Sequence, residues 1–392
     1  MRPLRAAAFA SAAALWLTSC GNERPPFIGD SPAGGRGGGG GEGALNVAGT
    51  NVAPSGPCGS QTIPAVSNPP NISFVIDHSG SMGNVLAGNG LSKYENARIA
   101  LSRVLRAIGH RVSYGAAIFP GLDGATGCEA GDELMRVGPG DPASYARENK
   151  TGPRLADLLR RLTLAGLDGG TPIAPTLDKM RGILSELEGE TYVVLITDGA
   201  PNCNIELTCG ADACIPNIEG LTADGMECTA TANCCSPSER NPFANLSCVD
   251  HDASLEAVAA LARSGIRTFV IGMPGSEPYE LLLNEMAVLG GTARDQTTQY
   301  YSVADTAALE GALRAIAASV AISCEISLDY APPDRDFVNV YFDGELVEYD
   351  SESGWEWADD GQVVIRGRAC EQLSAGDVVE VQVLAGCKTV VK

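Results

Sequence analysis

Oxygen-bearing side chains follow the first apolar run of the folded part of the chain, at a spacing suited to holding a cation. The run leads directly into Asp77-His78-Ser79-Gly80-Ser81. One carboxylate and two hydroxyls, each two residues from the next, are hard oxygen ligands. They follow the carboxyl end of a predicted strand, which is where open α/β sheets bind ligands. This segment therefore predicts a divalent-cation site.

Two later segments supply further oxygen ligands. Thr171 lies in the sequence Gly-Gly-Thr-Pro at the expected start of a helix, and Asp198 ends the apolar run Tyr192 to Thr197. Because parallel strands end along one edge of a sheet, we expect these side chains to meet Asp77 around one crevice. The predicted metal ligands are Asp77, Ser79, Ser81, Thr171 and Asp198.

These ligands need a scaffold of alternating strands and helices. Apolar runs and helical spacing predict strands at 71–77, 112–119, 192–197, 266–271 and 300–303, and helices at 92–108, 153–164, 172–187, 253–263, 279–289 and 306–320. The alternation predicts an α/β fold with a doubly wound, mostly parallel sheet and right-handed crossovers.

The three ligand segments together resemble the metal-ion-dependent adhesion site of the von Willebrand factor type A family. Phe74 to Met82, Gly169 to Pro172 and Val194 to Gly199 match its motifs in identity, order and approximate spacing. The resemblance covers residues 71–320, interrupted by a cysteine-rich segment. It implies a Rossmann-like domain that binds a partner and carries out no catalysis.

The resemblance also implies a role for each ligand. Ser79 and Ser81 would bind Mg²⁺ directly, Thr171 would do so directly or through water, and Asp77 and Asp198 would orient bridging waters. Mg²⁺ needs oxygen ligands in octahedral geometry at about 2.0–2.1 Å, and few direct anionic ligands leave it electrophilic. An open position would then accept an acidic side chain of a partner. Ca²⁺ and Mn²⁺ are the alternative metals.

The N-terminus predicts export. A positively charged start and an apolar run over 6–17 precede a Leu-Thr-Ser-Cys sequence that ends at Cys20 and resembles a bacterial lipobox. We therefore expect a signal peptide over 1–19, lipidation of Cys20, and anchoring to the outer membrane or cell surface of a Gram-negative bacterium. An ordinary secretory signal is the alternative. Residues 20–70, rich in Gly, Pro and Ser, are predicted to be a flexible tether.

The thirteen cysteines fit an exported protein. Without Cys20 they form an even set, in a compartment where disulfides persist. Pairing Cys58 with a tail cysteine, and Cys128 with Cys203, would leave six cysteines for bridges within the segment 203–248, whose connectivity stays open. The disulfide candidates are Cys58, Cys128, Cys203, Cys209, Cys214, Cys228, Cys234, Cys235, Cys248, Cys324, Cys370 and Cys387.

The segment 203–248 interrupts the alternation of strands and helices and is predicted to be a cysteine-rich insert stapled by disulfides. It begins shortly after Asp198, so we expect it to emerge beside the metal crevice and to form part of the partner-binding face. Residues 322–392 contain short alternating strands separated by Asp-Gly turns, which predict a small antiparallel β module. Trp355 and Trp357 are expected in the core of this module. The alternative is that the two tryptophans are exposed and bind a sugar.

The composition limits the classes of partner and of chemistry that this chain is expected to have. The chain has 27 Lys and Arg against 48 Asp and Glu, a formal charge of −21, so nucleic acids and anionic membrane surfaces would repel it. It has three histidines and no recognisable Ser-His-Asp arrangement, and we predict no catalytic residues. His78 is expected to have a packing or surface role. Cys248, Asp250 and His251 suggest zinc superficially, but exported cysteines oxidise.

The sequence thus predicts a non-enzymatic adhesion module, attached to the membrane only through its lipid anchor. It would bind a carboxylate-bearing protein or polymer through a divalent cation. The alternative is a disulfide-stapled structural scaffold of the envelope, in which the metal only stabilises the fold.

Overall fold

The computed structural model describes residues 61–63, 69–86, 88–122, 126–223, 225–321, 324–328, 331–332, 334–359, 361–375, 378 and 381–392. The predicted signal peptide, the lipidation site Cys20, most of the predicted tether and the disulfide candidate Cys58 lie outside these residues. Within the described part of the chain, no helix is both long enough and apolar enough to cross a membrane.

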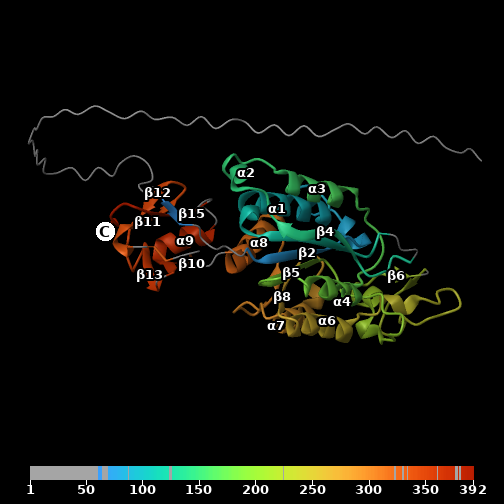
Figure 1. The fold of residues 1–392 in the computed structure, drawn as a ribbon. Coiled ribbons are helices and arrows are strands. Elements are labelled where there is room, and N and C mark those ends of the chain that lie inside the picture. Colours follow the sequence, from blue (N-terminus) through green and yellow to red (C-terminus); the bar gives the residue numbers. More distant parts are fainter. Residues whose placement is uncertain are drawn as a thin grey trace, which may run out of the picture. The chain divides into compact units, whose positions relative to one another are not determined.

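A six-stranded sheet forms the centre of the main domain, in the order β4-β3-β2-β5-β8-β9. Figure 1 labels β4, β2, β5 and β8 of this sheet. Five strands run parallel, and β4 pairs antiparallel with β3. Every residue of β2, β3 and β5 is buried, as expected for strands covered on both faces. The strands are β2 (Asn71–Asp77), β3 (Ser113–Phe119), β4 (Asp132–Pro139), β5 (Thr191–Thr197), β8 (Ile266–Gly272) and β9 (Tyr301–Ser302).

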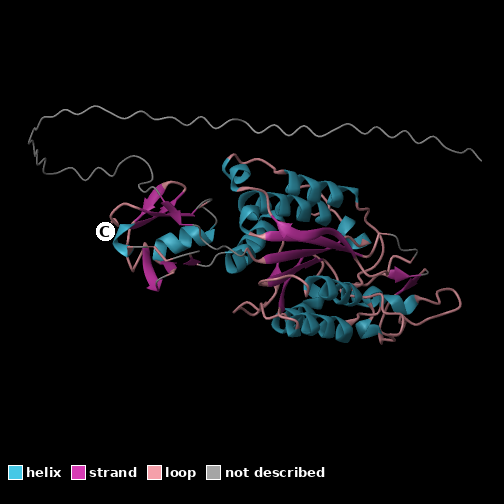
Figure 2. Cartoon of the chain, viewed as in Figure 1, coloured by secondary structure: helices cyan, strands magenta, loops and turns pink. Residues whose placement is uncertain are grey.

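Helices cover both faces of this sheet (Figures 1 and 2). One face packs against α1 (Lys93–Ile108), α3 (Pro153–Leu164) and α8 (Thr306–Ala321). The other packs against α4 (Ile173–Leu184), α6 (His251–Arg263) and α7 (Glu280–Leu289). Neighbouring strand residues divide between the two cores: Ile76 belongs to the first and Val75 to the second. The predicted doubly wound, mostly parallel α/β sheet is confirmed.

The segment between β3 and α3 differs from the sequence prediction. It forms the antiparallel edge strand β4 and the short helix α2 (Ala143–Arg147), neither of which was predicted. β4 carries Asp132, Glu133 and Arg136 among its apolar residues and is only partly buried. An edge strand with charged side chains lacks the continuous apolar run that identified the central strands.

The cysteine-rich insert folds into short elements held by disulfides. The bonds within it join Cys209 to Cys248, Cys214 to Cys235 and Cys228 to Cys234. Its elements are the 3-10 turns η3 (Ala211–Ala213) and η4 (Ala244–Ser247), the helix α5 (Ile215–Ile218) and the strands β6 (Thr222–Ala223) and β7 (Met226–Glu227).

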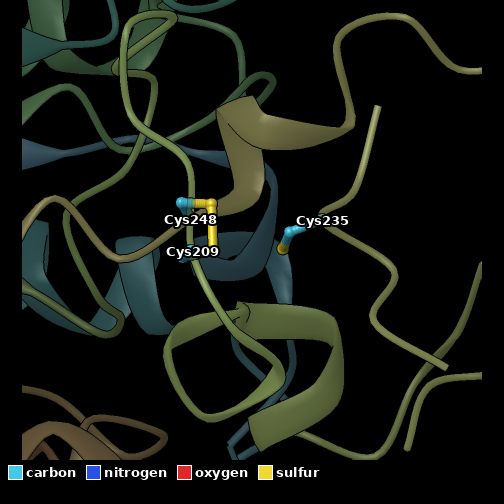
Figure 3. Close-up of side chains that lie close together, drawn as sticks. All are labelled: Cys209, Cys235 and Cys248. Atoms are coloured by element: carbon cyan, nitrogen blue, oxygen red, sulfur yellow. A yellow bond between two sulfur atoms is a disulfide. The ribbon is translucent and has the colours of Figure 1, made fainter. Parts of the chain in front are cut away.

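Two of these disulfides pack together in the insert's own small core. The sulfur atoms of Cys209, Cys235 and Cys248 lie within 4.8 Å of one another, and Figure 3 shows the Cys209–Cys248 bond beside Cys235. All three sulfurs are in disulfides, so none is a thiolate that could bind zinc. The cluster therefore replaces the apolar core that so short a segment cannot build.

The C-terminal tail forms a separate core from two antiparallel sheets, β1-β15-β11-β12 and β10-β14-β13, as the predicted antiparallel module requires. The disulfide Cys324–Cys370 lies in this module, and Cys387 is also disulfide-bonded. Its elements are β1 (Gln61–Ile63), β10 (Glu325–Ser327), β11 (Val338–Phe342), β12 (Glu345–Val347), β13 (Trp355–Asp359), β14 (Gln362–Ile365), α9 (Gly367–Ala375) and β15 (Val381–Ala385).

Two features of the tail correct the sequence interpretation. Gln61–Ile63, predicted as part of the flexible tether, is a strand that pairs with β15. Residues 367–375 form the helix α9 in a module predicted to be all β. The tryptophans lie in the core of the module, as predicted. Trp355 is fully buried there, and the Trp357 ring packs edge-on against the Trp355 ring, with 5.6 Å between the ring centroids.

Candidate metal centre

The carboxyl ends of the neighbouring strands β2 and β5 bring Asp77 and Asp198 to one edge of the sheet. The two strands pair in parallel from Asn71 to Ile76, so their last residues lie side by side. Thr197 Oγ1 donates a hydrogen bond to Asp77 Oδ2 at 2.6 Å, and the Ser79 backbone N–H donates to Asp77 Oδ1 at 2.8 Å. Asp77 is fully buried. Its carboxylate is therefore held in one orientation at the floor of the site.

Hydroxyl groups connect the first ligand segment to the third. Ser79 Oγ and Ser81 Oγ lie 3.1 Å apart, and Ser81 Oγ donates to Asp198 Oδ1 at 2.8 Å. Ser79 and Asp198 are buried, whereas Ser81, in the 3-10 turn η1 (Gly80–Gly83), is exposed. The site thus has a buried floor and opens to solvent on the side of Ser81.

Backbone contacts place Thr171 between the other two segments. The Gly80 N–H donates to Gly169 O at 3.2 Å, which joins the loop of Thr171 to the loop of Ser79. On its other side, the Thr171 N–H donates to Asn202 Oδ1 at 2.7 Å, and the Asn202 N–H donates back to Thr171 O at 2.9 Å. The structure therefore brings the three loops that carry the predicted ligands together.

The disulfide Cys128–Cys203 closes against the loop that carries Thr171. The Gly170 N–H donates to Gly127 O at 2.8 Å, beside one cysteine of the bond. A Cβ atom at Gly170 would lie only 2.6 Å from the sulfur of Cys203. Only glycine leaves room for the disulfide here, which explains one of the two glycines in the Gly-Gly-Thr-Pro motif. The bond links the two segments that hold this loop.

The charges of the site do not balance. Burial, together with the negative charge of Asp198, raises the pKa of Asp77 to about 7, against the opposing effect of its hydrogen bonds from Ser79 and Thr197. Among the described residues, the ammonium group that contacts these carboxylates is that of Lys93, whose Nζ donates to Asp198 Oδ2 at 2.6 Å. Two carboxylates therefore share a largely buried site with one ammonium group.

This set of donors fits a hard divalent cation. Hydroxyl and carboxylate oxygens are the ligands that Mg²⁺, Mn²⁺ and Ca²⁺ prefer, and the five predicted ligand side chains contain no sulfur or imidazole donor. Burial and the neighbouring charge of Asp198 both favour the protonated, neutral form of Asp77, and a nearby positive charge would favour its ionised form. A bound cation would supply that charge.

Sequence patterns missed three residues that shape the site: Lys93, Thr197 and Asn202. Thr197 could have been noticed as a hydroxyl at the end of an otherwise apolar run. Lys93 lies at the start of a helix, where a lysine side chain is expected to be exposed to solvent. Its contact with Asp198 joins the start of α1 to the residue that follows β5, 105 positions further along the chain, which no local pattern encodes.

His78 and His251 each contact groups other than the predicted metal ligands. His78 is buried, and its ring nitrogens each lie 2.6 Å from a carbonyl oxygen, of Gly166 and of Pro120, so it ties two loops together, in agreement with the predicted packing role. Cys248 is in a disulfide, and His251 Nε2 lies 3.1 Å from Glu285. The sequence around Cys248 and His251 that suggested zinc therefore does not form a set of zinc ligands.

No protein-family model and no curated protein matches this chain. Similar solved structures include the pilus adhesin SpaC from Lactobacillus rhamnosus GG, with a TM-score of 0.46, 15% identity, and coverage of 82% of this chain and 40% of SpaC. The PilB minor pilin from Streptococcus sanguinis has a TM-score of 0.42 and 18% identity, covering 68% of this chain and 63% of PilB.

The vWF domain of the type V pili tip protein Mfa5 from Porphyromonas gingivalis has a TM-score of 0.40 and 16% identity, covering 67% of this chain and 96% of that domain. With 40% of SpaC covered, this chain spans less than half of the length of that adhesin. Strand order and register within this chain define its fold.

Proposed function

We propose that this protein is a non-enzymatic binding module that grips a carboxylate-bearing partner through a divalent cation. Asp77, Ser79, Ser81, Thr171 and Asp198 would hold the cation, with Mg²⁺ as the expected metal. The convergence of these ligand segments on one open edge of the sheet carries the proposal, above all the contacts that link Ser79, Ser81 and Asp198.

The chain's own groups define how such a site would work. Ser81 donates its proton to Asp198 Oδ1 and can accept one from Ser79 Oγ, which leaves one lone pair of its oxygen to face a cation. Asp77 and Asp198 each have both carboxylate oxygens in hydrogen bonds, which suits them to orient water rather than to bind directly. A bound cation would supply an electrophilic position for an incoming carboxylate oxygen.

Two further proposals place this module in its setting. Lipidation of Cys20 would anchor it to the envelope of a Gram-negative bacterium, and the Gly-rich tether would let it reach partners away from the membrane. The insert, whose Cys203 is fixed beside the Thr171 loop, would form one rim of the binding face.

Mn²⁺ binding tests the metal site directly. Titration followed by electron paramagnetic resonance should show one saturable Mn²⁺ site that Mg²⁺ displaces. Ser81→Ala, which truncates an exposed ligand and should fold normally, should weaken binding about tenfold or more. Ser102→Ala, a similar truncation on α1, is the matched control. No saturable site in the unaltered protein, or equal affinity in both variants, would overturn the proposal.

The partner chemistry needs a second measurement. Short immobilised peptides that each contain one Glu, and matched peptides with Gln, should be compared with Mg²⁺ and with EDTA. Binding to Glu peptides alone, and only with Mg²⁺, is expected.

The many disulfides favour one alternative, a structural scaffold in which the metal serves only stability. Chelation would then lower the Tm, and Mg²⁺ would have no effect on binding to any peptide.

A further inference from the structure

Lys93 and Asp198 form a buried ion pair inside the candidate metal centre. Nζ and Oδ2 lie 2.6 Å apart, and the two side chains are 9% and 0% exposed. By contrast, Lys179 and Asp132, paired at 3.0 Å in the same domain, are 44% and 36% exposed. Removing a lysine from water is costly unless a specific partner compensates it. The burial of Lys93 therefore depends on its ion pair with Asp198, which makes Lys93 part of the site.

Three parts of the fold hold the Lys93 ammonium in place. Ser92 and Glu95 form a capping box that fixes the first turn of α1, and the Lys93 N–H donates to Asn84 O at 3.0 Å. On the far side, Gly275 has a φ of +109°, and a Cβ there would come within 2.9 Å of Lys93 Nζ. Glycine at this position leaves the space that the ammonium occupies.

The helix itself does not favour a cation at this position. Lys93 is the first residue of α1, and the N-terminus of a helix carries partial positive charge. The negative charge of Asp198 must outweigh this repulsion together with the desolvation of the ammonium. The pair is thus held by the chemistry of the site rather than by the preferences of the helix.

A charge count shows what this lysine does. With both carboxylates ionised, as metal binding requires, Asp77, Asp198 and Lys93 sum to −1. A divalent cation brings the centre to +1, whereas without Lys93 the loaded centre would be neutral. A positive centre repels the metal more strongly, but it attracts a further carboxylate.

We propose that Lys93 is a counter-ion built into the metal centre, which weakens metal binding and leaves the loaded centre positively charged so that an external carboxylate completes it. This inference rests on the proposed metal-dependent function. Lys93 acts as a positioning residue: it engages Asp198 Oδ2 while Ser81 engages Oδ1. Both oxygens are thereby occupied, which disfavours direct bonding of Asp198 to the metal.

Lys93→Met tests the proposal, with Lys93→Arg as the variant that keeps the charge and Lys179→Met as the matched control. Lys93→Met should lower the Mn²⁺ Kd about tenfold or more, because it removes a neighbouring positive charge. It should also lower the Tm in EDTA by several degrees, because Asp198 loses its counter-ion, and increase the Tm gain on adding Mg²⁺. Lys93→Arg should retain weak metal binding, and Lys179→Met should match the unaltered protein.

The peptide assay gives a second readout. Despite tighter metal binding, Lys93→Met should bind the Glu peptides more weakly in saturating Mg²⁺. A purely structural lysine would lower the Tm without tightening metal binding, and that result would overturn the inference while leaving the proposed function intact. No Mn²⁺ binding by the unaltered protein would overturn both. Should Lys93→Met not fold, Lys93→Gln serves in the same tests with the same expected changes.

Discussion

The disulfide Cys128–Cys203 offers a sharp test of how the site is built. We predict that the double variant C128S/C203S loses both stability and metal affinity. The bond joins two segments that each contact the Thr171 loop, one through Gly127 and the other through Asn202. Without it, the loop loses its covalent brace, and Thr171 should no longer be held in position for the cation.

The expected losses follow from loop length and from the contacts of the loop. The bond spans a sequence separation of 75 residues. Chain-entropy arguments give about 4 kcal/mol of unfolding free energy for a loop of that size. The loss of support around a metal ligand typically weakens metal binding about 10-fold to 100-fold. Since Thr171 is one ligand of several, we expect a loss of about tenfold.

The tail disulfide Cys324–Cys370 provides the control. It lies within the tail module and spans a sequence separation of 46 residues. The same chain-entropy argument gives about 4 kcal/mol of unfolding free energy for this bond. Urea denaturation measures stability, and Mn²⁺ titration under oxidising conditions measures affinity. C324S/C370S should destabilise the tail and leave Mn²⁺ affinity unchanged. Equal Mn²⁺ affinity in both double variants would refute the bracing role of Cys128–Cys203.

Three further predictions concern the site and the tail. In EDTA, the free energy of unfolding should fall as the pH rises from about 4 towards about 7, because folded Asp77, with its raised pKa, holds its proton more tightly than the unfolded chain does. Urea titrations should show a smaller fall in Mg²⁺ and in Asp77→Asn than in the unaltered protein in EDTA; an equal fall in Asp77→Asn would contradict this. Gly275→Ala should cost more stability than Gly88→Ala, because both have a φ of +109° but only the Cβ at Gly275 meets Lys93. Backbone strain alone should cost about 1–2 kcal/mol at either position, and equal losses by urea denaturation would exclude the contact. Trp355→Ala should destabilise the tail by about 3–5 kcal/mol in denaturation experiments, because the ring is fully buried. Unchanged Mn²⁺ affinity is expected in that variant, and a loss would show that the tail supports the site.

Local patterns were sufficient for much of the main domain. β2 and α3 have the bounds predicted from the sequence, and β5 differs by one residue. These segments are predictable because a central strand must be apolar on both faces and an amphipathic helix must repeat its apolar face every turn. Asp77 ends one such strand and Asp198 directly follows another, so their meeting at one edge could be inferred before the fold was known.

Elements at the edges of sheets were not predictable in this way. β4 is half-exposed and charged, and β1 is three residues long and pairs through its backbone. Backbone pairing leaves no periodic side-chain signal in so short a segment. The disulfide pattern of the insert was equally open, since it depends on which sulfur atoms the folded loops bring together.

The sequence by itself determined the class of the fold and the oxygen chemistry of the candidate site, because both depend on residue type and short spacing. Only the tertiary structure decided what surrounds that chemistry. Lys93 reaches Asp198, Thr197 orients Asp77, and Cys203 meets Gly170 through contacts between segments far apart in the chain. Charge balance and ligand support are properties of those contacts, since burial and distance, not residue type, set the strength of each interaction.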